Sequence, residues 1–141
     1  MKLIKILLLL LISLTVSIKV NSNEKLIDSL KEGGKLIFIR HAHAPVNGDP
    51  KNFNIKDCLT QRNLDLKGIN QSKKIGLFFK NNLIQIDKVL SSEWCRCKDT
   101  AFLAFMKFEE KPFLNSFYDQ KFAKNKKKQI YELKKYINNW S

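Results

Sequence analysis

Residues 35–45 read KLIFIRHAHAP, and this stretch decides the fold that the sequence predicts. It opens with a short apolar run, residues 35–40, which follows a pair of glycines. A continuous apolar run of this length, bounded by glycines, is typical of a strand buried in a parallel sheet. We therefore expect a buried strand whose carboxyl end carries Arg40 and His41.

Helical and strand-like segments alternate along the rest of the chain. Apolar residues at helical spacing predict four helices, and a second short apolar run predicts another strand. The helices are expected at 24–31, 64–81, 94–106 and 129–140, and the strand at 86–90. Asp65 is the expected N-cap of the second helix. Residues 41–62 predict a long loop, and residues 111–117 a short strand or an irregular loop. This order predicts a layered α/β fold.

Length and charge limit the kind of protein. The chain has 141 residues, of which 44% are hydrophobic, so it is one ordinary domain with a core and not a disordered chain. The net charge is +13, but arginine stands only at positions 40, 62 and 96 and lysine supplies the rest. We interpret the lysines as solvated surface and expect no nucleic-acid partner; binding to nucleic acid or an acidic surface is the alternative.

The first 22 residues have the pattern of a secretory signal peptide. Two lysines near the start precede an apolar run at 6–18, which is short for a membrane span, and small residues precede a cleavage point after Ser22. We expect residues 23–141 to be the mature domain, periplasmic or secreted, without a stable membrane anchor. An uncleaved anchor is the alternative.

Three cysteines permit one disulfide. Cys95 and Cys97 are too close in sequence to pair without strain, so Cys58 is expected to pair with either of them, leaving one thiol over. A metal site is the alternative, but no fourth ligand at a suitable spacing is visible.

Chemistry-bearing residues follow both expected strands. Arg40 and His41 end the first strand, Ser91 and Ser92 follow the second, and Arg96 comes one turn into the next helix. In open α/β sheets such carboxyl ends meet in one crevice. Guanidinium groups grip phosphate bidentately, and an imidazole beside them can attack phosphorus to form a phosphohistidine.

Three segments in order resemble the histidine phosphatase superfamily, the phosphoglycerate mutase-like proteins. They are IFIRHAHAP, LDLKGINQS and VLSSEWCRCKDTA, and the resemblance extends from residue 35 to about residue 117. It implies a three-layer αβα fold with a mainly parallel sheet, and catalysis without a metal or another cofactor. It also implies that His41 is the nucleophile and that Arg40 and Arg96 bind phosphate, with Arg62 as a further phosphate or substrate contact.

The sequence departs from this family in two places. The family carries a second histidine late in the chain, whereas this sequence has only His41 and His43, so we expect the domain to be incomplete at its C-terminus. The family also often has an acid in the segment matching 114–116, where none stands here. Asp119 and Glu110 are possible substitutes.

The expected function is therefore an exported phosphatase. It would act on a phosphorylated small molecule or a cell-envelope phosphoester. The alternatives are an inactive, phosphate-binding relative and a basic surface-binding protein.

Simpler interpretations exist for the remaining residues. His43 is expected to be a loop or pocket-wall histidine instead of half of a His-x-His metal pair, and Arg96 has the alternative of a solvent-facing helix arginine. The serines at 91 and 92 are expected to end the strand and cap the helix, and Trp94 and Trp140 to serve in packing.

Overall fold

The structure, a computed structural model, describes residues 22–140 of a chain that divides into two compact units, 1–33 and 34–141. The described part of the first unit is helix α2 (Ser22–Lys31), which confirms the helix expected at 24–31. The signal peptide predicted at 1–22 lies outside the described residues except for Ser22. Between residues 22 and 140, no helix has the length and apolar character needed to cross a membrane.

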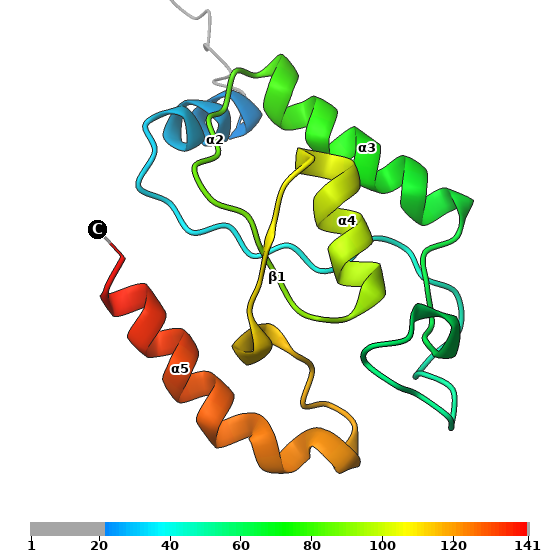
Figure 1. Cartoon of the computed structure of the whole chain (residues 1–141). Helices are drawn as coiled ribbons and strands as arrows, with labels where there is room; N and C mark the ends of the chain where they lie inside the picture. Colours follow the sequence, from blue (N-terminus) through cyan, green and yellow to red (C-terminus); the bar gives the residue numbers. More distant parts are fainter. Residues whose placement is uncertain (1–21, 141) are drawn as a thin grey trace, which may run out of the picture. The chain divides into compact units, whose positions relative to one another are not determined.

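Two helices that lie side by side form the centre of the second unit (Figure 1). They are α3 (Leu66–Asn81) and α4 (Cys95–Phe105), close to the predicted bounds. Asp65 caps α3 as expected, since its side chain accepts a hydrogen bond from the Gly68 amide. The two backbones touch at Gly76, where a Cβ atom would lie 2.2 Å from the carbonyl oxygen of Ala104. Phe79 is buried at the same contact.

One small parallel sheet accompanies the helices. Strand β1 (Leu90–Ser91) pairs with β2 (Glu109–Glu110), and Leu90 lies opposite Glu109. The strand expected at 86–90 is thus reduced to its last residue and shifted toward the serines. Because each strand has two residues, the three-layer αβα arrangement stays a prediction.

The first expected strand does not form. The structure has no strand at residues 35–40, and all of them are exposed, Phe38 to 71%. The prediction of a buried strand there is wrong for a physical reason: a strand needs a hydrogen-bonded neighbour, and β1 bonds to β2 instead. The apolar side chains of Leu36 and Ile39 remain at the surface.

The C-terminal part is helical. After β2 come two 3₁₀ helices, η2 (Pro112–Leu114) and η3 (Gln120–Asn125), and then α5 (Lys126–Asn138). The helix predicted at 129–140 therefore begins three residues earlier and ends two residues earlier. Buried Gln129 joins α5 to η2 and the loop after it, since its Nε2 donates to the carbonyls of Pro112 (3.0 Å) and Asn115 (3.1 Å).

The loop predicted at 41–62 is irregular apart from the short 3₁₀ helix η1 (Cys58–Thr60). A disulfide joins Cys58 to Cys95 at the start of α4, which decides between the two pairings that the sequence left open. Cys97 is the free thiol. The long loop is thereby fixed covalently to the helix that carries Arg96.

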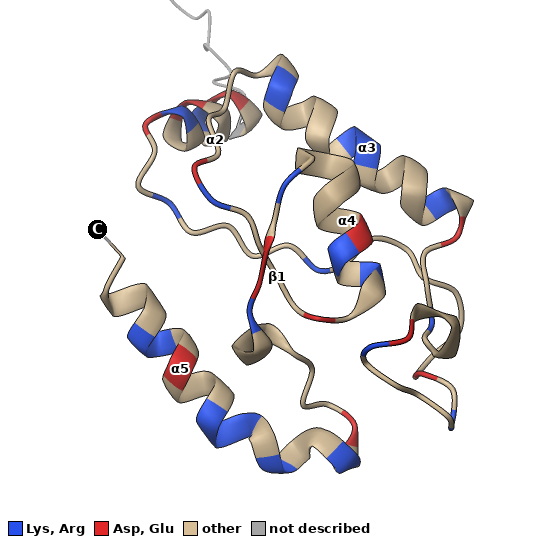
Figure 2. Cartoon of the chain, viewed as in Figure 1, with Lys and Arg blue, Asp and Glu red and all other residues tan. Residues whose placement is uncertain are grey.

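Basic side chains are spread along the chain, not gathered on one element. Figure 2 shows lysine and arginine on α3, α4 and α5 and on the connecting loops. The interpretation of the lysines as solvated surface stays a prediction.

Candidate functional site

The backbone after His41 is held by α4. The Ala42 amide donates to the Thr100 hydroxyl (3.0 Å), and that hydroxyl donates to the Arg96 carbonyl (2.7 Å). Ala42 and Thr100 are both buried. His41 and the helix carrying Arg96 are therefore fixed to each other although they are far apart in sequence.

Helix α3 holds the same backbone from another side. The His43 amide donates to the Gln71 side chain (2.9 Å), and a Cβ atom at Gly68 would lie 2.0 Å from the His43 carbonyl oxygen. Only glycine permits so close an approach. The His43 imidazole contacts the Asp65 carboxylate at 3.0 Å, which fits the expected loop histidine.

The hydrogen bond of the His41 imidazole defines its reactive atom. Its Nδ1 lies 2.7 Å from the Ala42 carbonyl oxygen. A carbonyl only accepts, so Nδ1 carries the proton in this contact. In the neutral ring, Nε2 is then the nitrogen with a free lone pair.

The surroundings of His41 favour that neutral ring. Burial lowers its pKa most, and the charges of Arg96, Arg62 and Arg40 lower it further. The hydrogen bond to the Ala42 carbonyl acts in the opposite direction but does not outweigh them. The four residues predicted for the site therefore interact electrostatically with one another.

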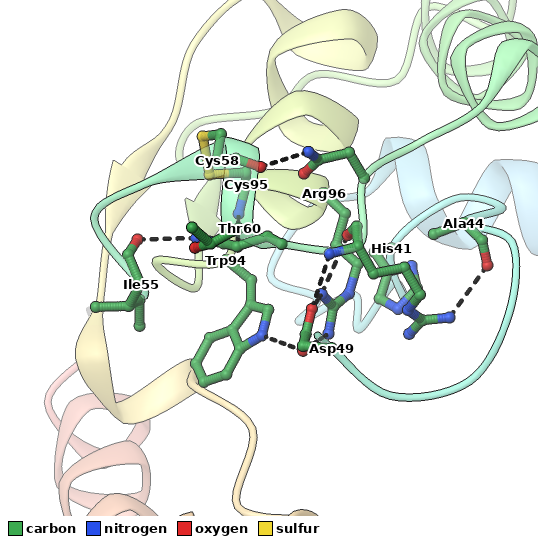
Figure 3. A network of polar contacts seen from close by, with 12 residues as sticks. His41, Ala44, Asp49, Ile55, Cys58, Thr60, Trp94, Cys95 and Arg96 are labelled. Carbon is green, nitrogen blue, oxygen red and sulfur yellow. Dashed lines mark hydrogen bonds and ion pairs between the residues drawn. A yellow bond between two sulfur atoms is a disulfide. The ribbon is translucent and has the colours of Figure 1, made fainter. Parts of the chain in front are cut away.

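Arg96 forms a bidentate ion pair with Asp49, a residue that the sequence did not point to. Its Nη1 and Nη2 donate to the two carboxylate oxygens of Asp49, at 2.7 and 3.2 Å (Figure 3). Arg96 is only 6% exposed, so it is not a solvent-facing arginine. Asp49 also accepts from the Trp94 indole (3.0 Å) and from the Arg62 amide (3.0 Å).

These contacts keep Asp49 ionised. Partial burial by itself raises the pKa of the carboxyl, but the hydrogen bonds from Arg96, Trp94 and Arg62 outweigh it and hold the pKa below its usual value. In Figure 3 the Asp49 carboxylate lies against the guanidinium group of Arg96, whose charge acts on His41. The carboxylate thus takes the place that a bound anion would take on the guanidinium of Arg96.

The other two arginines differ in their surroundings. Arg62 Nη1 donates to the carbonyls of Ala44 (3.1 Å) and Val46 (2.7 Å), which folds the loop around it. Arg40 is exposed and acts on His41 through its charge. The Nε atoms of Arg62 and Arg96 are buried without a partner among the described residues. A buried N–H without an acceptor is costly, so both N–H groups lower the stability of the folded site.

The residues before α4 differ in two ways from what the sequence predicts. Ser91 and Ser92 are buried at the strand end as expected, but neither caps α4, because its N-cap is Trp94 without a side-chain bond. An acid does approach the segment 114–116, since Glu93 accepts from the Asn115 side chain (2.5 Å). No local sequence pattern predicts this contact, because it joins positions 22 apart.

Among residues 22–140, no three His, Cys, Asp or Glu side chains gather in a way that could hold a metal ion. No family model matches the chain, and comparisons with curated proteins and with solved structures give no match either. The function must therefore be argued from the site itself.

Proposed function

We propose that this chain is an exported phosphatase of the histidine phosphatase type, with its phosphatase domain in residues 23–141 and a three-layer αβα fold. It hydrolyses a phosphomonoester through a phosphohistidine on His41. The observation that carries the proposal is the His41 Nδ1 contact with the Ala42 carbonyl at 2.7 Å, which leaves Nε2 as a nucleophile. The cationic surroundings of that imidazole support it.

The chemistry takes two steps. Nε2 of His41 attacks phosphorus, the P–N bond forms as the P–O bond breaks, and the leaving oxygen takes a proton from solvent. Water then attacks the phosphohistidine, the P–N bond breaks, and inorganic phosphate leaves. Arg40, Arg62 and Arg96 stabilise the charge that spreads over the phosphoryl oxygens.

None of four acids of the described residues 22–140 is well suited to protonate the leaving group. Asp49 is held ionised, Glu110 is exposed and paired with Lys98 (3.4 Å), and the Asp119 carboxylate caps η3. The Glu93 carboxylate accepts a hydrogen bond from the Asn115 side chain. A substrate whose leaving oxygen is already a weak base needs no such acid. The proposed substrates are therefore phosphorylated small molecules, or cell-envelope phosphoesters, with good leaving groups.

The second candidate function is phosphate binding without turnover. The observation that favours it is the bidentate Asp49 contact with Arg96, at 2.7 and 3.2 Å. Phosphate must displace this carboxylate or bind beside it. If it binds only beside it, Arg96 cannot grip the transferred phosphoryl group.

The test is hydrolysis of phenyl phosphate, with and without a chelator, by the wild-type protein and by His41→Ala. We expect wild-type activity that survives chelation, and at least a hundredfold loss in the variant, because removing a nucleophile removes the covalent route. A variant that keeps a tenth of the activity contradicts the proposal. If the wild type is inactive but binds inorganic phosphate in calorimetry, the second candidate holds.

A further inference from the structure

A pocket of about 590 Å³ lies in the second unit beside Trp94. It is bounded by residues of the loop 51–55, by residues 115–116 and by η3. This volume lies in the range of pockets that hold small organic molecules. Nothing in the proposed chemistry of His41 uses it.

The pocket has an aromatic wall. Phe53 stacks on Trp94 with ring centroids 5.2 Å apart, and Phe122 meets both rings edge-on, at 5.7 and 5.5 Å. Trp94 is 3% exposed and its indole N–H is bonded to Asp49, so this ring of the wall is held in place. Rigid aromatic surfaces favour flat, apolar ligands.

The rim of the pocket is positively charged. Lys51 and Lys121 line it, and no acidic residue of the described chain does. The Lys121 Nζ lies 4.9 Å from the Phe53 ring centroid and 5.0 Å from that of Phe122. An anion that reaches this ammonium group therefore lies beside the aromatic wall.

The pocket and the candidate site share Trp94. Its ring lines the pocket, while its indole N–H donates to Asp49 (3.0 Å), whose carboxylate holds Arg96. Trp94 therefore connects the wall of the pocket to the carboxylate that holds Arg96.

We propose that this pocket binds the leaving group of the substrate, and that this group is a flat ring carrying its own negative charge. The ring extends the stack formed by Phe53 and Trp94, and its charge meets Lys51 and Lys121. This inference rests on the proposed function and narrows it to phosphomonoesters of ring-bearing organic anions.

Binding is tested first without any phosphoryl group. In a Trp140→Phe protein, Trp94 is the one remaining tryptophan. We expect 4-nitrobenzoate to quench its fluorescence saturably, and the neutral 4-nitrobenzamide to bind several-fold more weakly. The double variant Lys51→Gln/Lys121→Gln should weaken 4-nitrobenzoate binding by about tenfold, since each lysine contributes a modest, salt-sensitive attraction.

The matched control is Lys73→Gln/Lys74→Gln. It makes the same change of charge at exposed positions of α3 that do not line the pocket. It should bind 4-nitrobenzoate like the parent protein. Absence of saturable quenching contradicts the proposal that the pocket binds a ring-bearing anion. Equal weakening of binding by the two double variants contradicts it as well.

The role as a leaving-group site is tested by kcat/KM for 4-carboxyphenyl phosphate against phenyl phosphate. We expect a preference for the charged ester that Lys51→Gln/Lys121→Gln removes. Hydrolysis without this preference overturns the inference and leaves the proposed function intact. Binding of 4-nitrobenzoate without hydrolysis of either ester overturns the proposed function and the leaving-group role, and leaves the pocket as an organic-anion site.

Discussion

At the scale of single residues, the candidate site depends on the charge state of one imidazole. The lowered pKa of His41 means that the neutral, nucleophilic ring persists below its ordinary value of 6.5. We predict that the acid limb of the kcat/KM profile for phenyl phosphate lies below pH 6.5. An NMR titration of the His41 ring, assigned with a His43→Gln variant, measures the same pKa without needing activity.

The same shift affects folding in a defined direction. The unfolded chain takes up the His41 proton near pH 6.5, and the folded chain only at lower pH. The stability from the neutral imidazole is thus complete above pH 6.5 and declines as pH falls toward the folded-state pKa. A titration midpoint at or above 6.5 contradicts the cationic, partly buried environment described here.

Asp49 occupies the guanidinium group of Arg96 and so limits the binding of an anion there. We predict that Asp49→Asn binds inorganic phosphate about tenfold more tightly, because one negative charge next to the guanidinium groups is gone. The variant should also lose about 3 kcal/mol of unfolding free energy, since Arg96 keeps its buried charge without a partner. Calorimetry with phosphate and urea unfolding measure the two effects.

The control for this change is Asp87→Asn, which removes an equal charge at an exposed position. It should leave phosphate affinity unchanged. Unchanged or weaker phosphate binding by Asp49→Asn means that the carboxylate does not compete for the anion. Because Arg96 is buried and not the solvent-facing arginine of the alternative interpretation, Arg96→Lys should cost stability as well as turnover.

At the scale of elements, the disulfide between Cys58 and Cys95 fixes the long loop to α4. It spans a separation of 37 residues, for which the chain-entropy model gives about 3–4 kcal/mol. We predict that Cys58→Ala loses stability of that order in urea unfolding. Cys97→Ala, which removes the free thiol, is the control and should change stability little. Equal losses in both variants contradict a disulfide that stabilises this loop.

The helices were predictable from the sequence because their signals are local. The periodicity of α3 and the capping side chain of Asp65 lie within a few residues of each other, and both were read correctly. Gly68 and Thr100 lie in two of the matched segments, but the sequence analysis assigned them no role. The structure shows their contacts, since Gly68 lies against the His43 carbonyl and Thr100 accepts from the Ala42 amide.

The parts that sequence reasoning missed depend on distant partners. The Asp49 contact with Arg96 joins residues 47 positions apart, and no local sequence pattern predicts it. The apolar run at 35–40 has the composition of a strand, but pairing is decided by the neighbour, which a single segment does not specify. Strand β1 was misplaced for the same reason.

At the scale of the whole molecule, the backbone on the two sides of His41 differs in how many hydrogen bonds hold it. The backbone from Ala42 onward is bonded to α3 and α4, whereas residues 36–40 make no described hydrogen bond and are exposed. Local opening costs little free energy where contacts are few. His41 therefore lies at the boundary between a fixed segment and a loosely held one.

This boundary is measurable by amide hydrogen exchange. We predict that the amides of residues 36–40 exchange at least about a hundredfold faster than those of Ala42 and Leu103, because only the latter donate to a fixed partner inside the packed unit. The change from fast to slow exchange should fall between Arg40 and Ala42. Strong protection across 36–40 would instead mean that this run is paired in solution. The buried strand of the layered fold would then form, and His41 would be held rigidly from both sides.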